Sequence, residues 1–287
     1  MHGCLKIDMY FLDFYGISRY PGTNKYLIVM RYVEQGDLKK YLACNITNNS
    51  WKNRIDKLWG LAIDLRTLHS SNLVHRDIHS GNVLFGKDRR SFIADFGLTC
   101  KDGQDQEKEV KGVLPYIAPE ILVRKPHTKA TDVYSFGILM WECTSYQAPF
   151  CNMAYDIELA LRIYGGLRPP VVKGTPECYV QLMKRCWDAD PTKRPTAHTL
   201  SETLQKWQYI LSSDGYENND IRKQFEMAEK ERQDTPIFIK PYPPEKTHPL
   251  AILTSRILPT LTLPSPPGYQ TKQINLMIED DMYVNDD

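Results

Sequence analysis

The segment His75–Asn82 reads HRDIHSGN and places a carboxylate, an imidazole and an amide close together in the chain. The carboxylate of Asp77 can accept the proton of a hydroxyl or orient it, which is general-base chemistry. The amide oxygen of Asn82 is a kind of ligand that magnesium takes in proteins. The same segment can also be read as a polar turn after a helix, so it does not decide its chemistry alone.

A second carboxylate, Asp95, stands thirteen residues beyond Asn82. It follows the apolar residues Phe92–Ala94, which are typical of a short strand, and precedes Phe96 and Gly97. A strand that delivers an aspartate to a turn favoured by glycine suits a metal-binding carboxylate. The two segments together predict one carboxylate that handles a hydroxyl and another that handles a metal ion.

Three further segments follow in the order that a known family uses. Ala118–Glu120 begins 23 residues past Asp95, Asp132 opens DVYSFG, and Arg194 lies in DADPTKRPT. With the two earlier segments, they resemble the catalytic domain of protein kinases, over about residues 5–210. The stretches GVLPYIAPE and RCWDADPTKRP are most similar to the tyrosine-kinase-like group, which usually modifies Ser or Thr.

The resemblance implies an α+β, two-lobed protein-kinase-like fold with a complete helical C-lobe. It also implies two cofactors, ATP and magnesium, and transfer of the γ-phosphate to protein Ser or Thr hydroxyls, with Tyr left open. Protein substrates are the implied partners. A small-molecule phosphotransferase is a weaker alternative, because the segment Ala118–Glu120 is built to dock peptides in the family.

The family's functional residues carry over onto matching positions of this sequence. The implied catalytic residues are Asp77, His79 and Asn82, and the implied magnesium ligands are Asn82 and Asp95. The implied nucleotide-binding residues are Met30, Arg31, Tyr32, Val33, Asp37, Leu84 and Asp95. The implied structural residues are His75, Arg76, Phe96, Gly97, Glu120, Asp132 and Arg194.

Several of these positions carry a more specific expectation. Glu120 and Arg194 are expected to form a buried ion pair, and Asp132 to brace the backbone of the catalytic loop. Asp37 is placed either to meet a ribose hydroxyl or to cap a helix, and both interpretations stay open. Met30 and Leu84, the expected gatekeeper and floor of the adenine site, are expected to be buried in either case.

Two positions depart from the family pattern. His79 stands where Ser/Thr kinases usually carry a lysine that touches the γ-phosphate, and Val113 stands where a Thr is common. An imidazole supplies less charge than a lysine unless it is protonated. His79 is therefore expected to be an atypical neighbour of the phosphate, and the acceptor residue is less sharply defined.

A third departure is an absence, because no glycine-rich loop and no VAIK-like lysine precede Tyr15. The antiparallel N-lobe sheet is therefore expected to be truncated, and the kinase activity of the printed chain to be negligible. One explanation is an incomplete gene model; the other is a pseudokinase or kinase-lobe scaffold that acts as a binding module. The sequence favours the first, because the catalytic and magnesium carboxylates are present. A regulatory partner that completes or covers the N-lobe fits either explanation.

The elements that position these residues fall into three stretches: 1–35, 36–210 and 211–287. Residues 1–35, the remnant of the N-lobe and hinge, have two β-rich runs joined by a turn at 21–24. Residues 36–210 have helical periodicity, for example in the apolar face of Leu58, Leu61 and Leu65. Residues 211–287 are proline-rich, and a largely disordered tail with one charged helix over 218–233 is expected.

Composition excludes several other classes of protein. A net charge of +1 favours neither a nucleic-acid binder nor a basic membrane-surface protein. No apolar run approaches the roughly 20 residues that cross a bilayer, so no membrane segment is expected. The seven cysteines include no CxxC pair, which favours reduced thiols and a cytoplasmic location, with the nucleus left open.

Overall fold

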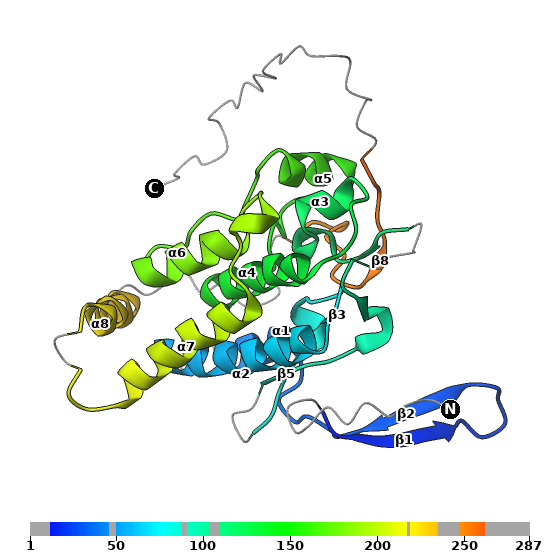
Figure 1. The fold of residues 1–287 in the computed structure, drawn as a ribbon, viewed down its shortest axis with the longest axis horizontal. Helices are drawn as coiled ribbons and strands as arrows, with labels where there is room; N and C mark the ends of the chain where they lie inside the picture. Colours follow the sequence, from blue (N-terminus) through cyan, green and yellow to red (C-terminus); the bar gives the residue numbers. More distant parts are fainter. Residues whose placement is uncertain are drawn as a thin grey trace, which may run out of the picture.

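The computed structural model describes residues 12–45, 50–87, 91–103, 109–216, 219–234 and 247–261. In it, a two-stranded hairpin projects from one end of a helical lobe, and helix α8 lies at the other end (Figure 1). The α+β architecture expected from the sequence, a small antiparallel sheet beside a helical lobe, is confirmed.

Strands β1 (Phe14–Arg19) and β2 (Tyr26–Met30) form the projecting hairpin. They pair antiparallel, and the backbone N–H of Tyr20 closes the turn by donating to Lys25 O at 2.9 Å. Gly22 lies in this turn with φ +75°, a conformation that residues with a side chain adopt at a cost. The hairpin lies where the sequence predicted one, with its first strand beginning at Phe14.

Both faces of this hairpin are exposed to solvent. Ile28 is 66% exposed and its neighbour Leu27 is 43% exposed, and successive strand residues point to opposite faces. The expectation that Met30 is buried is wrong, because Met30 at the end of β2 is 44% exposed. The reason is that no described element packs on either face of β1–β2.

The helical lobe is built from eight described helices. They are α1 (Leu38–Cys44), α2 (Trp51–Ser70), α3 (Pro119–Leu122), α4 (Lys129–Ser145), α5 (Ile157–Tyr164), α6 (Glu177–Cys186), α7 (Ala197–Ser212) and α8 (Asp220–Asp234). Helix α2 begins at the N-cap Ser50, whose hydroxyl accepts from Asn53 N, and its apolar face is buried as predicted. Helix α4 is buried nearly all round and forms the centre of the lobe. Gly137 allows α6 to approach α4 closely, since a Cβ at this position would lie 2.8 Å from Cys186 Cβ.

Three short strand pairs join the loops of this lobe. They are β3 (Leu73–Val74) with β6 (Cys100–Lys101), β4 (Val83–Phe85) with β5 (Ser91–Ile93), and β7 (Lys111–Gly112) with β8 (Arg256–Ile257). All three are antiparallel. The first two pairs hold the loops that follow β3 and β5 next to each other, and those loops carry Asp77 and Asp95.

Two segments of the C-terminal stretch pack on the lobe. Phe225 of α8 is 1% exposed, and its ring lies 5.8 Å from that of Trp51 and 5.6 Å from that of Trp207. Farther along, Leu258 and Leu261 are 4% and 7% exposed. The charged helix expected over 218–233 is α8, whereas the expectation of a disordered tail is wrong for residues 247–261. Apolar side chains spaced among the prolines supply the burial that the average composition of the tail conceals.

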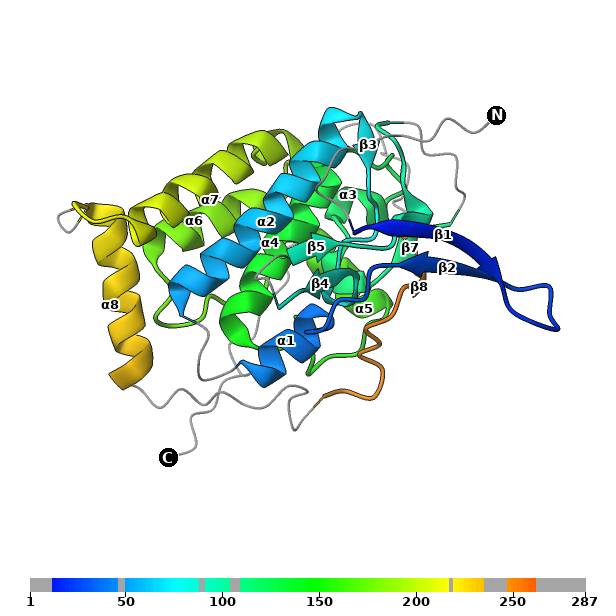
Figure 2. The same cartoon turned by 90° about the horizontal axis from the view of Figure 1, so that it is seen from below.

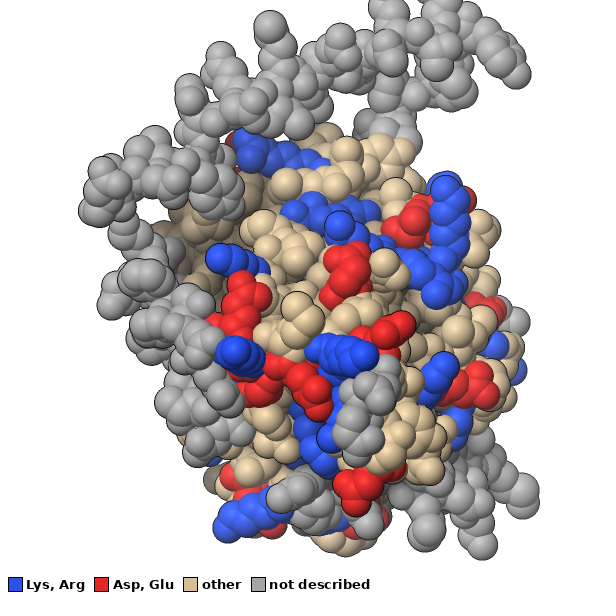
Figure 3. All heavy atoms as spheres, turned by 90° about the vertical axis from the view of Figure 1, so that its left-hand side faces the viewer, with Lys and Arg blue, Asp and Glu red and all other residues tan. Residues whose placement is uncertain are grey.

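No helix in the described parts of the chain is long and apolar enough to cross a membrane. On the face shown in Figure 3, basic and acidic side chains alternate and no patch of one sign stands out. The described residues on this face therefore form no basic stripe of the kind that binds nucleic acid.

Candidate functional site

The loop after β3 is held by the carboxylate of Asp132, which is buried at the start of α4. It accepts hydrogen bonds from His75 N at 2.8 Å, from Arg76 N at 3.0 Å and from His69 Nε2 at 2.9 Å. Burial alone would raise the pKa of Asp132, but the hydrogen bond and charge of His69, with His75, hold this pKa below its ordinary value. The ionised group thus stabilises Arg76 in its left-handed conformation, φ +76°.

Asp77 follows directly and is almost fully buried. Its backbone N–H donates to His75 Nδ1 at 3.3 Å, and Asn82 Nδ2 donates to Asp77 O at 2.9 Å and Asp77 Oδ2 at 3.2 Å. Burial would raise the pKa of Asp77, but hydrogen bonds from His79 and Ser255 outweigh it and lower this pKa. Asp77 is therefore an ionised acceptor, which is the state that a general base needs.

Asn82 and Asp95 are brought together by the β4–β5 pair. Val83 pairs with Ile93, and Ala94 N donates to Asn82 O at 2.9 Å. Asp95 directly follows Ala94, so this backbone hydrogen bond holds Asp95 near Asn82. Asp95 has φ +64° and is exposed, and its Oδ1 accepts from Gly97 N at 3.2 Å. Asp77, Asn82 and Asp95 thus belong to one cluster.

The donor set of this cluster fits magnesium. Among the described residues, both side-chain hydrogen bonds of Asn82 are donated by Nδ2 and none involves its oxygen, and the Asp95 carboxylate faces solvent. Magnesium is typically bound by one or two such protein oxygens together with phosphates and water. No group of three or more His, Cys, Asp or Glu that could hold a metal ion occurs among the described residues.

The His79 ring lies beside the Asp77 carboxylate and the hydroxyl of Ser255. Its Nδ1 accepts from Gly81 N at 3.1 Å, so the ring proton lies on Nε2. Nε2 lies 3.7 Å from Asp77 Oδ2 and 3.2 Å from Ser255 Oγ. The hydrogen bond from Gly81 orients Nε2 toward Ser255 Oγ, and the expected place of His79 beside a phosphate stays a prediction.

A buried acid lies beneath this loop and was not anticipated from the sequence. Tyr116 OH donates to Glu142 of α4 and lies 3.1 Å from Ser80 Oγ, while the Tyr116 and His79 rings are 6.1 Å apart. Burial raises the pKa of Glu142 to about 7, against the hydrogen bond from Tyr116 and the charge of Lys39. The sequence signal was weak, because a lone glutamate in DVYSFGILMWE has no partner in its own helix.

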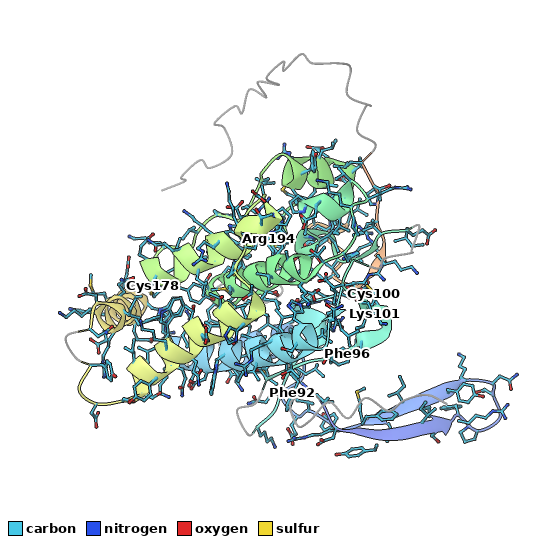
Figure 4. All side chains as sticks on the ribbon, viewed as in Figure 1. Phe92, Phe96, Cys100, Lys101, Cys178 and Arg194 are labelled. Carbon is cyan, nitrogen blue, oxygen red and sulfur yellow. The ribbon has the colours of Figure 1, made fainter. Side chains whose placement is uncertain are left out.

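Most of the expected nucleotide residues lie at the end of β2 or between β2 and α1, and Leu84 lies in β4. Val33 is buried, whereas Tyr32 is 77% exposed. Asp37 caps α1 by accepting from Lys40 N at 2.9 Å, and it forms a bridge with Leu84 of β4. Leu84 is only half-buried, so its expected burial is incomplete. Arg31 lies over the Phe92 ring at 5.7 Å, where the hairpin meets the lobe (Figure 4).

The expected structural residues lie around this cluster. Arg194 donates to both carboxylate oxygens of Glu120, at 2.7 and 2.8 Å, and lies within the helical lobe (Figure 4). The rings of His75 and Phe96 are 5.1 Å apart, and Phe96 stays 38% exposed. Arg76 reaches the loop after Phe96 by donating to Leu98 O at 3.3 Å.

Ser255 is the residue of this site that the sequence did not reveal. Its hydroxyl oxygen lies 2.8 and 2.6 Å from the two carboxylate oxygens of Asp77. The available signal was the apolar run that surrounds Ser255, Leu250–Leu258, inside a tail otherwise rich in proline. No local pattern connects that run to Asp77.

Comparisons with known proteins agree with this geometry. Residues 9–204 match a family model described as protein tyrosine and serine/threonine kinase. The chain is 35% identical over 188 residues to serine/threonine/tyrosine-protein kinase HT1 of Arabidopsis thaliana, covering 63% of this chain and 47% of that protein. It is 31% identical over 192 residues to "Probable serine/threonine-protein kinase drkA" of Dictyostelium discoideum, covering 66% of this chain and 29% of that protein. The chain therefore spans less than half the length of these relatives.

Proposed function

This chain belongs to the protein tyrosine and serine/threonine kinase family, and we propose that it transfers the terminal phosphoryl group of ATP to protein serine or threonine hydroxyls. One observation carries the proposal: the ionised Asp77 carboxylate and a serine hydroxyl, Ser255 Oγ, are 2.6 Å apart. A general base must lie within this reach of the proton that it takes. Tyrosine stays open as a second acceptor.

The residues divide the work according to their contacts. Asp77 orients the acceptor hydroxyl and takes its proton, and His79 Nε2 donates to the acceptor oxygen. Asn82 and Asp95 hold magnesium, which when bound neutralises charge on the phosphate oxygens. Met30–Val33 frame the adenine, with Asp37 and Leu84 beside it.

No other element in the described part of the chain packs on either face of the β1–β2 hairpin. The bare faces of β1–β2 favour a covering segment or regulatory partner that completes this lobe.

A sensitive transfer assay tests the proposal. The 287-residue chain is incubated with magnesium and γ-labelled ATP, with dephosphorylated casein as the acceptor. The expected result is trace incorporation into casein, in line with the negligible activity expected from the sequence, that needs magnesium and disappears in Asp77→Asn and Asp95→Ala. Incorporation by the unchanged chain that does not exceed that of Asp77→Asn contradicts the proposal.

That negative result would favour the second candidate, a pseudokinase that acts as a binding module. The observation in its favour is the same Ser255, because its segment fills the place of an acceptor at Asp77. Both candidates predict that Asp77→Asn leaves the protein's interactions unchanged. They differ in phosphate transfer, which a kinase loses in Asp77→Asn and a binding module never shows.

A further inference from the structure

The segment 247–261 runs along the helical lobe and crosses the site at Asp77 (Figure 2). Its backbone is bonded to the lobe at several points. His248 N donates to Cys151 O at 2.7 Å, and Leu250 O accepts from Tyr155 N at 3.1 Å. Lys39 Nζ of α1 donates to Leu253 O at 3.3 Å. These contacts show that the part of the segment before Ser255 is held at several residues and not at one.

Beyond Ser255 the segment adds a strand to the lobe. Strand β8 pairs antiparallel with β7, Leu258 N donates to Val110 O at 2.8 Å, and Leu261 N donates to Leu122 O at 2.7 Å. Strand addition is a general mode of peptide recognition, in which the backbone gives affinity and pockets for alternate side chains give selectivity. On the lobe, Lys111 pairs with Ile257 and Gly112 with Arg256, and a Cβ at Gly112 would meet Ile117 Cδ1 at 2.6 Å.

The side chains of the segment alternate as such recognition requires. Ile257 is 59% exposed, whereas the next residue, Leu258, is 4% exposed and belongs to the core of the lobe. Leu253, two residues before Ser255, also packs against that core. Ser255 itself is exposed. The burial of Leu253 and Leu258, on its two sides, anchors the segment to the lobe.

The hydroxyl of Ser255 is held from two directions. Because His79 Nδ1 accepts from Gly81, His79 Nε2 carries a proton that it can donate to Ser255 Oγ. The hydroxyl proton is then free to go to Asp77, whose oxygens lie at 2.8 and 2.6 Å. This is the arrangement that an acceptor serine needs, and it is made by a serine of the same chain.

We propose that residues 248–261 are an intramolecular ligand of the acceptor-peptide groove, with Ser255 in the acceptor position. The inference rests on the proposed function for the name of the groove. An external protein can reach Asp77 only after this segment leaves. The groove selects serine peptides that carry an apolar residue two positions before the serine and another three positions after it, where Leu253 and Leu258 lie.

A binding experiment without nucleotide tests this inference. A fluorescein-labelled synthetic peptide, Thr247–Leu261, is titrated into the 287-residue chain, into Leu258→Asp and into the matched control Ile257→Asp, and anisotropy is recorded. A charge at buried position 258 should release the segment, so Leu258→Asp should bind the peptide about tenfold or more tightly than the unchanged chain. Ile257→Asp should bind it as weakly as the unchanged chain does.

Three further measurements keep the result independent of misfolding. Ser255→Asp, at an exposed position, should also open the groove, because it sets a second carboxylate beside Asp77. A peptide phosphorylated at the serine should bind the Leu258→Asp chain about tenfold more weakly than the plain peptide. In hydrogen exchange, the amides of Leu258 and Leu261 should be protected in the unchanged chain and lose protection in Leu258→Asp.

Equal affinity of the peptide for the unchanged and Leu258→Asp chains overturns the inference. So does exchange of the Leu258 and Leu261 amides at free-peptide rates in the unchanged chain. The casein assay remains separate: binding without transfer removes the proposed function but leaves the intramolecular ligand. Transfer to casein with no difference in peptide binding supports the proposed function and removes the intramolecular ligand.

Discussion

Arg194 donates two hydrogen bonds to the carboxylate of Glu120, at 2.7 and 2.8 Å, although the two residues are 74 positions apart in the sequence. The Arg194 side chain is fully buried, and its remaining groups donate to Asp188 O and Ala130 O. Planar guanidinium and carboxylate groups match in this two-point geometry. The pair therefore ties the residues after the site, at Glu120, to the loop before α7.

Removing one partner of this pair should destabilise the lobe. Glu120→Ala leaves a buried guanidinium without its counter-ion, so the free energy of unfolding should fall by about 3–5 kcal/mol in urea titration. Arg162→Ala is the control, because it breaks the exposed Arg162–Glu158 pair, which should cost below about 1 kcal/mol. Equal losses for the two variants would contradict the buried role of Glu120.

The buried acid Glu142 should make stability depend on pH. Its pKa rises from 4.5 to about 7 on folding, so the folded state binds the proton more tightly than the unfolded state. Its contribution is complete below about pH 4.5 and is lost as the pH rises toward about 7. From the shift, the loss is on the order of 3 kcal/mol at most.

Glu142→Gln isolates this contribution. The variant keeps an oxygen that can accept from Tyr116 OH but cannot ionise, so its unfolding free energy should vary less between about pH 5 and pH 8. Urea titrations of both proteins at the two pH values give the difference. Identical pH dependence would show that Glu142 does not titrate in this range.

Magnesium-dependent nucleotide binding should require Asp95. Asp95→Ala removes an exposed carboxylate beside Asn82, so the affinity for a fluorescent ATP analogue in magnesium should fall about tenfold or more, with little change in EDTA. Glu158→Ala, which removes an acid 70% exposed on α5, is the control. An Asp95→Ala chain that retains the full effect of magnesium would rule out Asp95 as its ligand.

Helix α8 should stabilise the lobe through one aromatic residue. Phe225→Ala empties a site between Trp51 and Trp207 and should lower the unfolding free energy by about 3–5 kcal/mol. Met227→Ala is a matched control on the same helix, since Met227 is 72% exposed, and should change it by less than about 0.5 kcal/mol. If thermal or urea unfolding does not separate the two variants, α8 is not docked as described.

The sequence alone determined the parts of this protein that depend on short separations. Asp77 and Asn82 are five residues apart and share a loop, so their proximity follows from the local backbone. The apolar faces of α2 and α7 follow from helical periodicity in the same way. The charged helix expected over 218–233 corresponds to α8, Asp220–Asp234, and its thin apolar stripe includes Phe225.

The tertiary structure decided what depends on packing between distant segments. Met30 looks like a core residue by type, yet its exposure is set by whether anything covers the hairpin. The pKa of Glu142 depends on burial by surrounding elements, which no feature of its own helix reports. Ser255 reaches Asp77 across 178 positions because Leu258 and Leu261 find buried places on the lobe. Such contacts form only when the elements pack together, because hydrophobic burial is non-directional and depends on the apolar area buried, whatever the separation of the residues along the sequence.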